Sequence, residues 1–358
     1  MARPEQTTVP GRVVVADDSR LMRRMLSDAL GRQGFEVVGT AADGDEALQQ
    51  CRMHKPDALT LDLHMPGLDG LGVLRALRDG KADPVPVVVV SAFSPAQGAY
   101  AVDALAEGAF ELVAKPGFGE PLETFTAELG RKVTAAAHSP RVRRPAARAV
   151  ARRPAPAAPA SRIGGPAVRR VGSGKLLVIA SSTGGPRALG ELVPQLPAQI
   201  GAGGVIVQHM PAGFTASLAQ RLDTAAQLTV REARTGDVLD PGALLLAPGG
   251  QHLRLSDDRR LRLSDEAPEG GLKPRADFTI QDAARTFGRR LVLVVLTGMG
   301  KDGLDGAHAV KRMGGRVLAE AESTCTVYGM PRAVAEAGLA DDVLPLDALP
   351  AAIARELA

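Results

Sequence analysis

The chain has 358 residues and a formal net charge of +3; 45% of its residues are hydrophobic and 23% are charged. Two globular domains are expected from this length, and the composition excludes a disordered or fibrous protein. The start of the chain lacks the apolar segment of a secretion signal, and no run approaches the roughly 18 apolar residues of a membrane-spanning helix. We therefore expect a cytoplasmic protein that is not embedded in a membrane.

Short β-branched runs alternate with amphipathic helical stretches in residues 10–135 and again in residues 173–358. This pattern predicts an α/β fold in both parts, with a mainly parallel sheet covered by helices on both faces. The expected strands of the first part are RVVVA, FEVVGT, DALTLDL, VPVVVVSA and ELVAKP. We expect a five-stranded parallel sheet in the first domain and a doubly wound α/β domain after it.

The expected strands of the first domain end in polar side chains. In open parallel sheets, functional groups gather at the carboxyl ends of the strands. These ends carry Asp17, Asp18, Asp62, Ser91 and Lys115. Three carboxylates on one rim would repel each other without a hard cation, so their oxygens predict a Mg²⁺ site. Taken singly, the alternative is structural: the paired aspartates would cap the next helix and the lysine would be solvated.

The order of these residues, together with LDLHMPGLDG and AKP, resembles the receiver domain of two-component response regulators over about residues 10–135. The resemblance implies a flavodoxin-like fold with Asp62 as the phosphoacceptor and a cis peptide bond before Pro116. It implies that Asp17, Asp18, Asp62 and the backbone carbonyl of His64 hold Mg²⁺, and that Ser91 and Lys115 sense the phosphoryl group. Leu112 departs from the family pattern, because many receivers have an aromatic residue there that swings inward on activation.

Residues 136–172 differ from the parts on either side. Between Ala135 and Gly174 there are nine arginines and no acidic residue, so the rest of the chain is net acidic. The segment is rich in Ala and Pro and has no hydrophobic periodicity, which predicts a solvated, semi-extended linker. Because it lacks aromatic residues for base stacking, we expect no nucleic-acid partner. Cys51 and Cys325 have no metal-like spacing and predict neither a disulfide framework nor a zinc site.

In the second domain, the apolar run LLVIA ends in the turn SSTGG, and a helix is expected from about Pro186. Such a turn can bind an anion or stabilise an oxyanion. Nucleotide binding is disfavoured, because neither a phosphate loop nor a dinucleotide-binding glycine motif is present. The other interpretation is a nucleophilic serine, which needs a base and an acid that orients the base. His209 and Asp302 end later strands, although each could alone be structural.

The motifs SSTGG, VQHMP, LAPGGQHL and LTGMGKDG resemble the catalytic domain of chemotaxis response-regulator protein-glutamate methylesterases. With the receiver and linker in front, the resemblance covers nearly the whole chain. It implies Ser182 as the nucleophile, His209 as the general base and Asp302 as the residue that orients the histidine. It further implies that Thr183 assists and that the backbone N–H of Met299 stabilises the oxyanion, without a cofactor. His252 and Arg275 are expected near the cleft.

The resemblance implies hydrolysis of glutamate methyl esters on methyl-accepting chemotaxis receptors, with release of methanol. A chemotaxis histidine kinase would phosphorylate the receiver, and the unphosphorylated receiver would cover the catalytic cleft. Deamidation of receptor glutamines is left open. The alternative is a phosphorylation-controlled receptor-binding regulator whose esterase site is vestigial.

Overall fold

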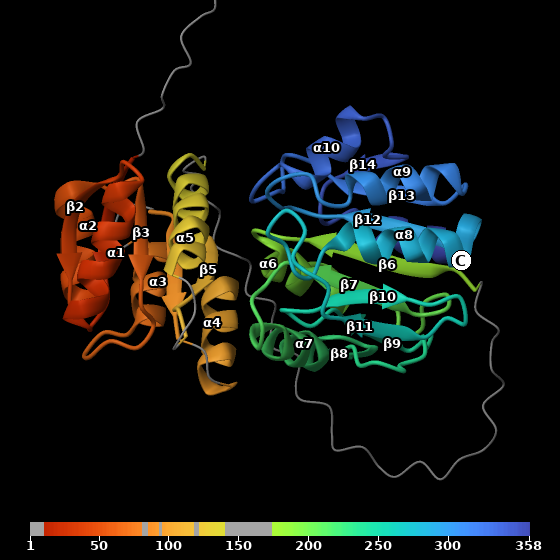
Figure 1. The fold of residues 1–358 in the computed structure, drawn as a ribbon, viewed down its shortest axis with the longest axis horizontal. Coiled ribbons are helices and arrows are strands. Elements are labelled where there is room, and N and C mark those ends of the chain that lie inside the picture. Colours follow the sequence, from red (N-terminus) through yellow and green to blue (C-terminus); the bar gives the residue numbers. More distant parts are fainter. Residues whose placement is uncertain (1–10, 81–84, 93–94, 118–121, 140–173) are drawn as a thin grey trace, which may run out of the picture.

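The computed structural model describes residues 11–80, 85–92, 95–117, 122–139 and 174–358. These residues form an N-terminal and a C-terminal domain, each built on its own parallel sheet (Figure 1). The linker predicted at residues 136–172 falls almost entirely outside the described residues. Within the described part of the chain, no helix is long and apolar enough to cross a membrane.

The N-terminal sheet has the strand order β2-β1-β3-β4-β5, with all neighbours parallel. Its strands are β1 (Arg12–Ala16), β2 (Glu36–Ala41), β3 (Ala58–Leu61), β4 (Val87–Ser91) and β5 (Glu111–Ala114). Helices α2 (Gly44–His54), α3 (Gly70–Arg78) and α4 (Pro95–Glu107) cover one face, and α1 (Arg20–Arg32) and α5 (Leu122–Ala137) cover the other. The predicted five-stranded parallel sheet is therefore confirmed.

The C-terminal sheet has seven parallel strands in the order β14-β13-β12-β6-β7-β9-β8. They are β6 (Leu176–Ser181), β7 (Gly204–Gln208), β8 (Thr229–Glu232), β9 (Ala243–Leu246), β12 (Leu291–Val295), β13 (Arg316–Glu320) and β14 (Asp342–Leu344). A separate antiparallel pair is formed by β10 (His252–Leu255) and β11 (Leu261–Ser264). The predicted doubly wound, mainly parallel domain is confirmed.

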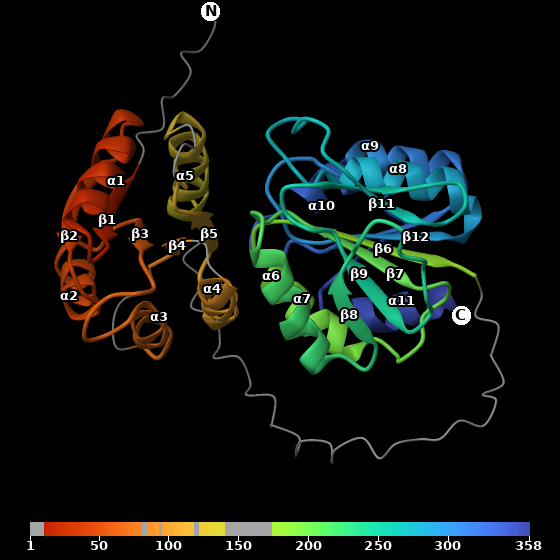
Figure 2. The same ribbon diagram turned by 60° about the horizontal axis from the view of Figure 1, so that its bottom comes forward.

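Helices cover both faces of the C-terminal sheet (Figure 2). One face packs against α6 (Gly185–Leu192), α7 (Phe214–Ala225) and α11 (Leu349–Leu357), and the other against α8 (Ala276–Phe287), α9 (Leu304–Arg312) and α10 (Met330–Glu336). Two short 3₁₀ helices span Val193–Gln195 and Gly288–Arg290. Along β6, Leu177 and Ile179 point to the first core, while Val178 and Ala180 point to the second. An apolar run is therefore required in this central strand.

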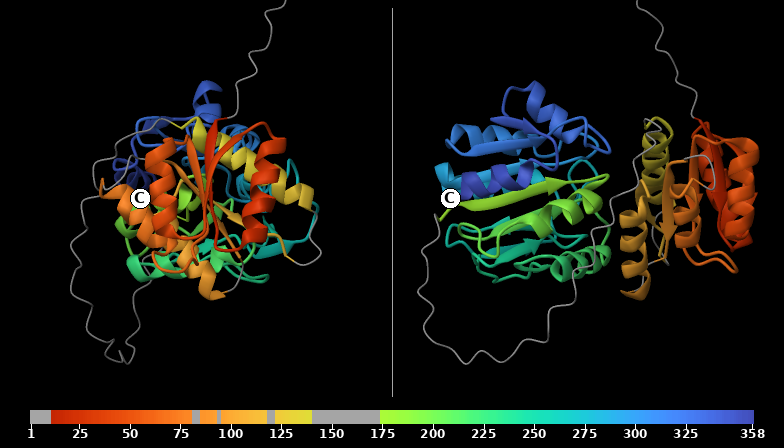
Figure 3. Two further views of the ribbon diagram at one scale, coloured as in Figure 1. Left: turned by 90° about the vertical axis from the view of Figure 1, so that its left-hand side faces the viewer. Right: turned by 180° about the vertical axis from the view of Figure 1, so that it is seen from behind.

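The N-terminal domain faces the C-terminal domain through α4, β5 and α5 (Figures 1 and 3). Helix α4 packs on α6 and α7, and one continuous apolar cluster includes Ala101 and Leu105 together with Leu189 and Leu218. An ion pair between Asp103 and Arg221 lies at the exposed edge of this contact. The contact places the N-terminal domain beside the turn that follows β6.

Candidate active site and phosphorylation site

The register of the central strands brings Ser182 and His209 to one rim. In the parallel pairing of β6 with β7, Ser181 is opposite Gln208, so the next residue of each strand reaches the same edge of the sheet. The backbone N–H of His209 donates to the carbonyl of Ser181 (3.1 Å). The Gln208 amide nitrogen donates to the carbonyl of Ser182 (2.9 Å), which ties the two turns together.

The strand on the other side of β6 delivers the loop that carries Asp302. The backbone N–H of Ser182 donates to the carbonyl of Thr297 (3.0 Å), just after β12. Position 298, which follows Thr297, must be glycine, because a Cβ there would lie 2.8 Å from the Ser182 Cβ and 2.4 Å from the Met330 sulfur. The three predicted strand ends thus meet beside β6, whose chain connection runs to β7 on one side, and β12, whose connection runs to β13 on the other. Such a reversal of connection direction is the usual place for a site in these sheets.

His209 and Asp302 form a direct pair at this rim. The His209 Nε2 lies 2.7 Å from the Asp302 Oδ2, and both side chains are buried. Because the carboxylate only accepts, Nε2 carries the proton, which we assign from this bond. The other ring nitrogen, Nδ1, is buried and has no hydrogen-bond partner in the described part of the chain. Its lone pair is therefore the group available to accept a proton.

The loop around Asp302 keeps its carboxylate charged. Burial alone would raise its pKa, but the hydrogen bond and charge of His209 outweigh burial and hold the pKa of Asp302 below the usual range. Backbone N–H groups of Ala276 (2.7 Å), Asp277 (3.0 Å) and Gly303 (3.0 Å) also donate to it. Hydrogen bonds to the charged form favour that form, so Asp302 can support a histidine cation.

Arg275 and His252, the two residues expected near the cleft, both lie close to the loop that carries Asp302. The Arg275 Nε is 3.6 Å from the Asp302 Oδ1, and the Arg275 guanidinium also pairs with Asp277 (3.1 Å) and Glu269 (3.3 Å). His252 is fully buried, and its Nδ1 accepts from the backbone N–H of Arg275 (3.2 Å). Burial lowers the pKa of His252. These contacts make His252 a neutral support for the Arg275 backbone.

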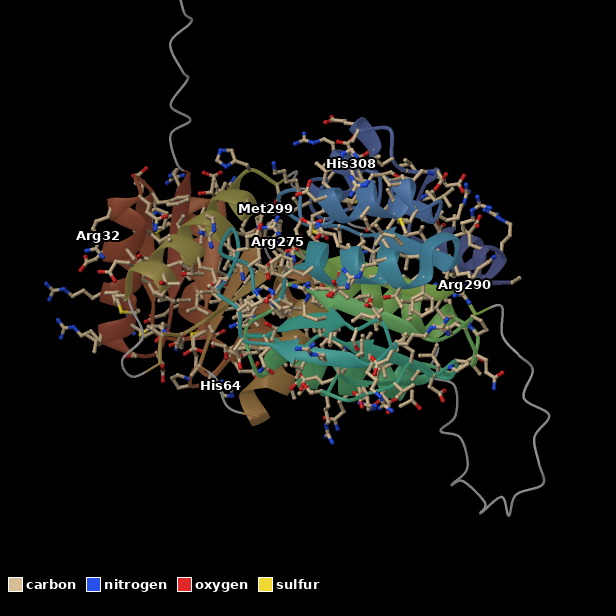
Figure 4. The ribbon with its side chains drawn as sticks, turned by 45° about the vertical axis from the view of Figure 1, so that its right-hand side comes forward. Arg32, His64, Arg275, Arg290, Met299 and His308 are labelled. Atoms are coloured by element: carbon tan, nitrogen blue, oxygen red, sulfur yellow. The ribbon has the colours of Figure 1, made fainter. Side chains whose placement is uncertain are left out.

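Thr183 and Met299 both lie where the N-terminal domain meets this rim. The buried Thr183 hydroxyl donates to the Glu111 Oε2 of β5 (2.6 Å). Met299 lines an interdomain cavity of about 460 Å³ whose opposite wall is made by α5 residues that include Arg131 and Thr134. Figure 4 shows Met299 and Arg275 on the side of the C-terminal domain that faces the N-terminal domain.

The predicted phosphorylation site is assembled at the carboxyl ends of β1 and β3. Ligand oxygens of Asp17, Asp18 and Asp62 lie within 4.8 Å of one another. Ser19 caps α1 by accepting from the Met22 N–H (3.4 Å), so neither paired aspartate occupies the N-cap position. Burial raises the pKa of Asp17, as expected for a carboxylate in a cluster that requires a cation. An acidic triad of this kind is typical of a Mg²⁺-dependent receiver site.

The Lys115 side chain pairs with two carboxylates of this cluster. Its Nζ lies 2.8 Å from the Asp17 Oδ2 and 2.7 Å from the Asp62 Oδ2. Burial would lower the pKa of Lys115, but its bonds to the two carboxylates raise it instead. Ser91 is fully buried at the end of β4, where its carbonyl accepts from the Lys115 N–H (2.8 Å) and its hydroxyl bonds to the Ala92 carbonyl (3.3 Å).

Three further expectations have different outcomes. The prediction of a cis peptide bond before Pro116 is wrong. The Lys115–Pro116 bond is trans, the form that X–Pro bonds favour, and within the described residues the cis bond precedes Pro274. The His64 side chain is exposed, and its ring lies tilted against that of Tyr100 with the ring centroids 5.2 Å apart. This placement is in keeping with a role for the His64 backbone alone. Leu112 is buried in the apolar core. As a leucine, it has no aromatic ring that could swing inward on activation.

Sequence reasoning missed several polar residues that complete these sites. Gln208 immediately precedes His209 and could have been found from its position at a strand end. Glu111 and Asp277 carried weaker signals: Glu111 is a charged residue opening an apolar strand, and Asp277 is an acid in the first turn of a helix. Their partners lie in other elements, which sequence spacing does not reveal.

Together these features define a response regulator whose receiver domain is joined to an α/β domain with serine, histidine and aspartate at one rim. Two family models match accordingly: the response regulator receiver domain over residues 13–124 and the CheB methylesterase over residues 177–353. The chain is 43% identical to the protein-glutamate methylesterase/protein-glutamine glutaminase of Symbiobacterium thermophilum, over 97% of each chain. It is 45% identical to enzyme 5 of that name from Myxococcus xanthus, over 97% of this chain and 98% of the relative.

A solved structure agrees with this assignment. The crystal structure of the Thermotoga maritima CheB methylesterase catalytic domain matches with a TM-score of 0.50 and 46% identity, covering 51% of this chain and 98% of that one. The chain belongs to the CheB-type family of protein-glutamate methylesterase/protein-glutamine glutaminases.

Proposed function

We propose that this protein is a phosphorylation-activated serine hydrolase that removes methyl groups from glutamate methyl esters on methyl-accepting chemotaxis receptors. Membership of the CheB-type family supports the reaction and the class of substrate. The observation that carries the proposal is the His209–Asp302 pair, with the unbonded Nδ1 of His209 at the strand end next to Ser182.

In the proposed mechanism, the Ser182 hydroxyl oxygen attacks the ester carbonyl while its proton passes to the Nδ1 of His209. Asp302 holds the opposite ring nitrogen and stabilises the imidazolium that forms. The carbonyl oxygen becomes an oxyanion, which the backbone N–H of Met299 binds; one such donor is typically worth on the order of 10² to 10³ in rate. The histidine then returns the proton to the leaving methoxide, and methanol departs.

The second half of the reaction regenerates the serine. His209 removes a proton from water, which attacks the acyl-serine, and the proton then returns to the Ser182 oxygen as the receptor glutamate leaves. A glutamine side chain would follow the same path with ammonia as the leaving group, because amides and esters share a tetrahedral intermediate. The glutaminase activity thus needs no additional residue.

Control by the N-terminal domain follows from the interdomain contact at the nucleophile turn. Glu111 of the receiver engages the hydroxyl of Thr183, directly after Ser182, and α5 stands opposite Met299. A receptor helix could not reach the rim while this contact persists. A chemotaxis histidine kinase would phosphorylate Asp62. The negative charge of the phosphoryl group would then attract the Lys115 side chain. This local change would shift the population toward separated domains.

The carboxylates of Asp17, Asp18 and Asp62 and the His64 carbonyl would hold Mg²⁺ in the receiver. The oxygen-only donor set, with three carboxylates in one cluster, fits this hard cation. Mg²⁺ supplies charge neutralisation for phosphoryl transfer, while Lys115 and Ser91 orient the phosphoryl oxygens.

Methanol release from a methylated receptor cytoplasmic fragment tests the proposal. Wild type and Ser182→Ala are compared with and without a small phosphodonor and Mg²⁺. We expect wild type to release methanol faster with the phosphodonor and Ser182→Ala to release none. If both proteins are inert while receptor binding still responds to phosphorylation, the protein is instead a binding regulator with a vestigial esterase site.

A further inference from the structure

Asp277 is a buried carboxylate that the mechanism above does not use. It lies in the first turn of α8 and is 2% exposed. Its Oδ1 accepts from the backbone N–H groups of Gly303 (2.9 Å) and Gly306 (2.7 Å), which open α9. The residue at the N-cap of α9 is Gly303, which has no side chain to satisfy these donors. Asp277 therefore supplies the cap of α9 from a neighbouring helix.

The relation between the two helices is reciprocal. Asp302, just before α9, accepts from the backbone N–H groups of Ala276 (2.7 Å) and Asp277 (3.0 Å), which open α8. Each aspartate thus caps the helix of the other. Loss of the Asp277 carboxylate would remove the acceptor of the Gly306 N–H (2.7 Å) and leave the Gly303 N–H bonded to Asp302 alone (3.0 Å).

The two carboxyl groups are also neighbours. The backbone N–H of Gly303 donates to one oxygen of each, to the Asp277 Oδ1 (2.9 Å) and to the Asp302 Oδ1 (3.0 Å). Burial and the negative charge of Asp302 raise the pKa of Asp277 to about 6, whereas the pKa of Asp302 is lowered. Asp277 therefore takes up a proton before Asp302 does as the pH falls, and Asp302 remains the carboxylate that faces His209. The groups that face this pair are His209 after β7, His252 on β10, and Glu269 and Arg275 before α8.

We propose that Asp277 is a positioning residue of the esterase: it fixes Asp302, and through Asp302 it fixes the His209 ring that accepts the Ser182 proton. The inference rests on the proposed function. It differs from a purely structural role for the cap, because a structural cap would affect stability without changing the rate or the pH dependence with which Ser182 reacts.

The test uses the full-length protein with phosphodonor and Mg²⁺, and measures the rate at which a fluorophosphonate labels Ser182. This readout needs no receptor and follows activation of the serine directly. Asp277→Ala removes the cap, and Asp277→Asn keeps an acceptor while removing the titratable group. Asp282→Ala is the matched control, because Asp282 is also a buried aspartate of α8 but bonds to Arg254 (2.7 Å) and not to Asp302.

We expect Asp277→Ala to slow labelling by at least about 10-fold, since loss of fixed geometry commonly costs this much or more. Asp277→Asn should recover most of that rate. Its pH profile should lack the step that ionisation of Asp277, with a pKa of about 6, adds to the profile of wild type. Asp282→Ala should label at the wild-type rate even where its melting temperature falls.

The inference is overturned if folded Asp277→Ala labels as fast as wild type, or if Asp277→Asn keeps the wild-type pH profile. It is also overturned if Asp282→Ala loses labelling to the same extent, since the effect would then be general destabilisation of α8. A wild-type protein that leaves Ser182 unlabelled contradicts the proposed function itself, and the inference with it.

Discussion

Asp302 and Asp277 are neighbours, yet their pKa values shift in opposite directions. Burial would raise the pKa of Asp302, but its bonds to His209 and to backbone N–H groups lower the pKa by more. Burial and repulsion by the charge of Asp302 both raise the pKa of Asp277. The signs of their contributions to stability are therefore opposite. Asp302 stabilises the fold above its unfolded pKa and loses this effect as pH falls. Asp277 favours the fold below its unfolded pKa and loses this effect as pH rises through about 6.

The second of these effects can be measured with Asp277→Asn, which cannot ionise. Between about pH 4 and pH 7, ionisation of Asp277 should lower the free energy of unfolding of wild type relative to this variant, by on the order of 1–3 kcal/mol. Urea unfolding of both proteins at the two pH values gives the difference. An equal difference at both pH values would contradict the proposed burial and repulsion of Asp277.

At the scale of elements, β5 joins the two sites of the molecule. It is a four-residue edge strand that begins at Glu111 and is followed directly by Lys115. Glu111 contacts Thr183 at the rim of the C-terminal sheet, while Lys115 contacts Asp17 and Asp62 of the predicted phosphorylation site. A strand of this length spans only about 10 Å. We therefore propose that a change in the pairing of Lys115 reaches Thr183 through this short strand.

Glu111→Gln tests this connection, because it keeps the side-chain shape and removes the charge that strengthens the bond to Thr183. A charge-assisted hydrogen bond is worth about 1 kcal/mol more than a neutral one, so basal methanol release without phosphodonor should rise by roughly 3- to 10-fold. The matched control is Glu128→Gln, which also removes a carboxylate partner of Lys132 but lies on α5. Equal basal rates in Glu111→Gln and wild type would exclude Glu111 as a restraint.

The sequence predicted those features that depend on local order along the chain. Both sheets, and Ser182, His209 and Asp302 at their strand ends, follow from apolar runs and parallel pairing. Glu111 could not be assigned, because its partner lies 72 residues away in another domain. The same holds for the exchange of caps between α8 and α9, which depends on how two helices pack.

For the whole molecule, the contact between the two domains consists mainly of an apolar interface, with an exposed ion pair at its edge. The continuous cluster from α4 into α6 and α7 holds the N-terminal domain against the esterase rim. The Asp103–Arg221 pair is exposed and contributes little, as surface ion pairs usually do. Helix α4 thus holds the domain in place, while β5 and α5 carry residues that lie against the turn after β6 and against Met299.

We infer that the receiver covers Ser182 and that phosphorylation of Asp62 uncovers it. The most direct measurement is the rate of fluorophosphonate labelling of Ser182 in the full-length protein, with and without phosphodonor and Mg²⁺. We predict faster labelling of wild type with the phosphodonor and no change for Asp62→Asn, which keeps Ser182 intact. A wild-type rate that ignores the phosphodonor, or an Asp62→Asn protein that responds to it as wild type does, would contradict the account.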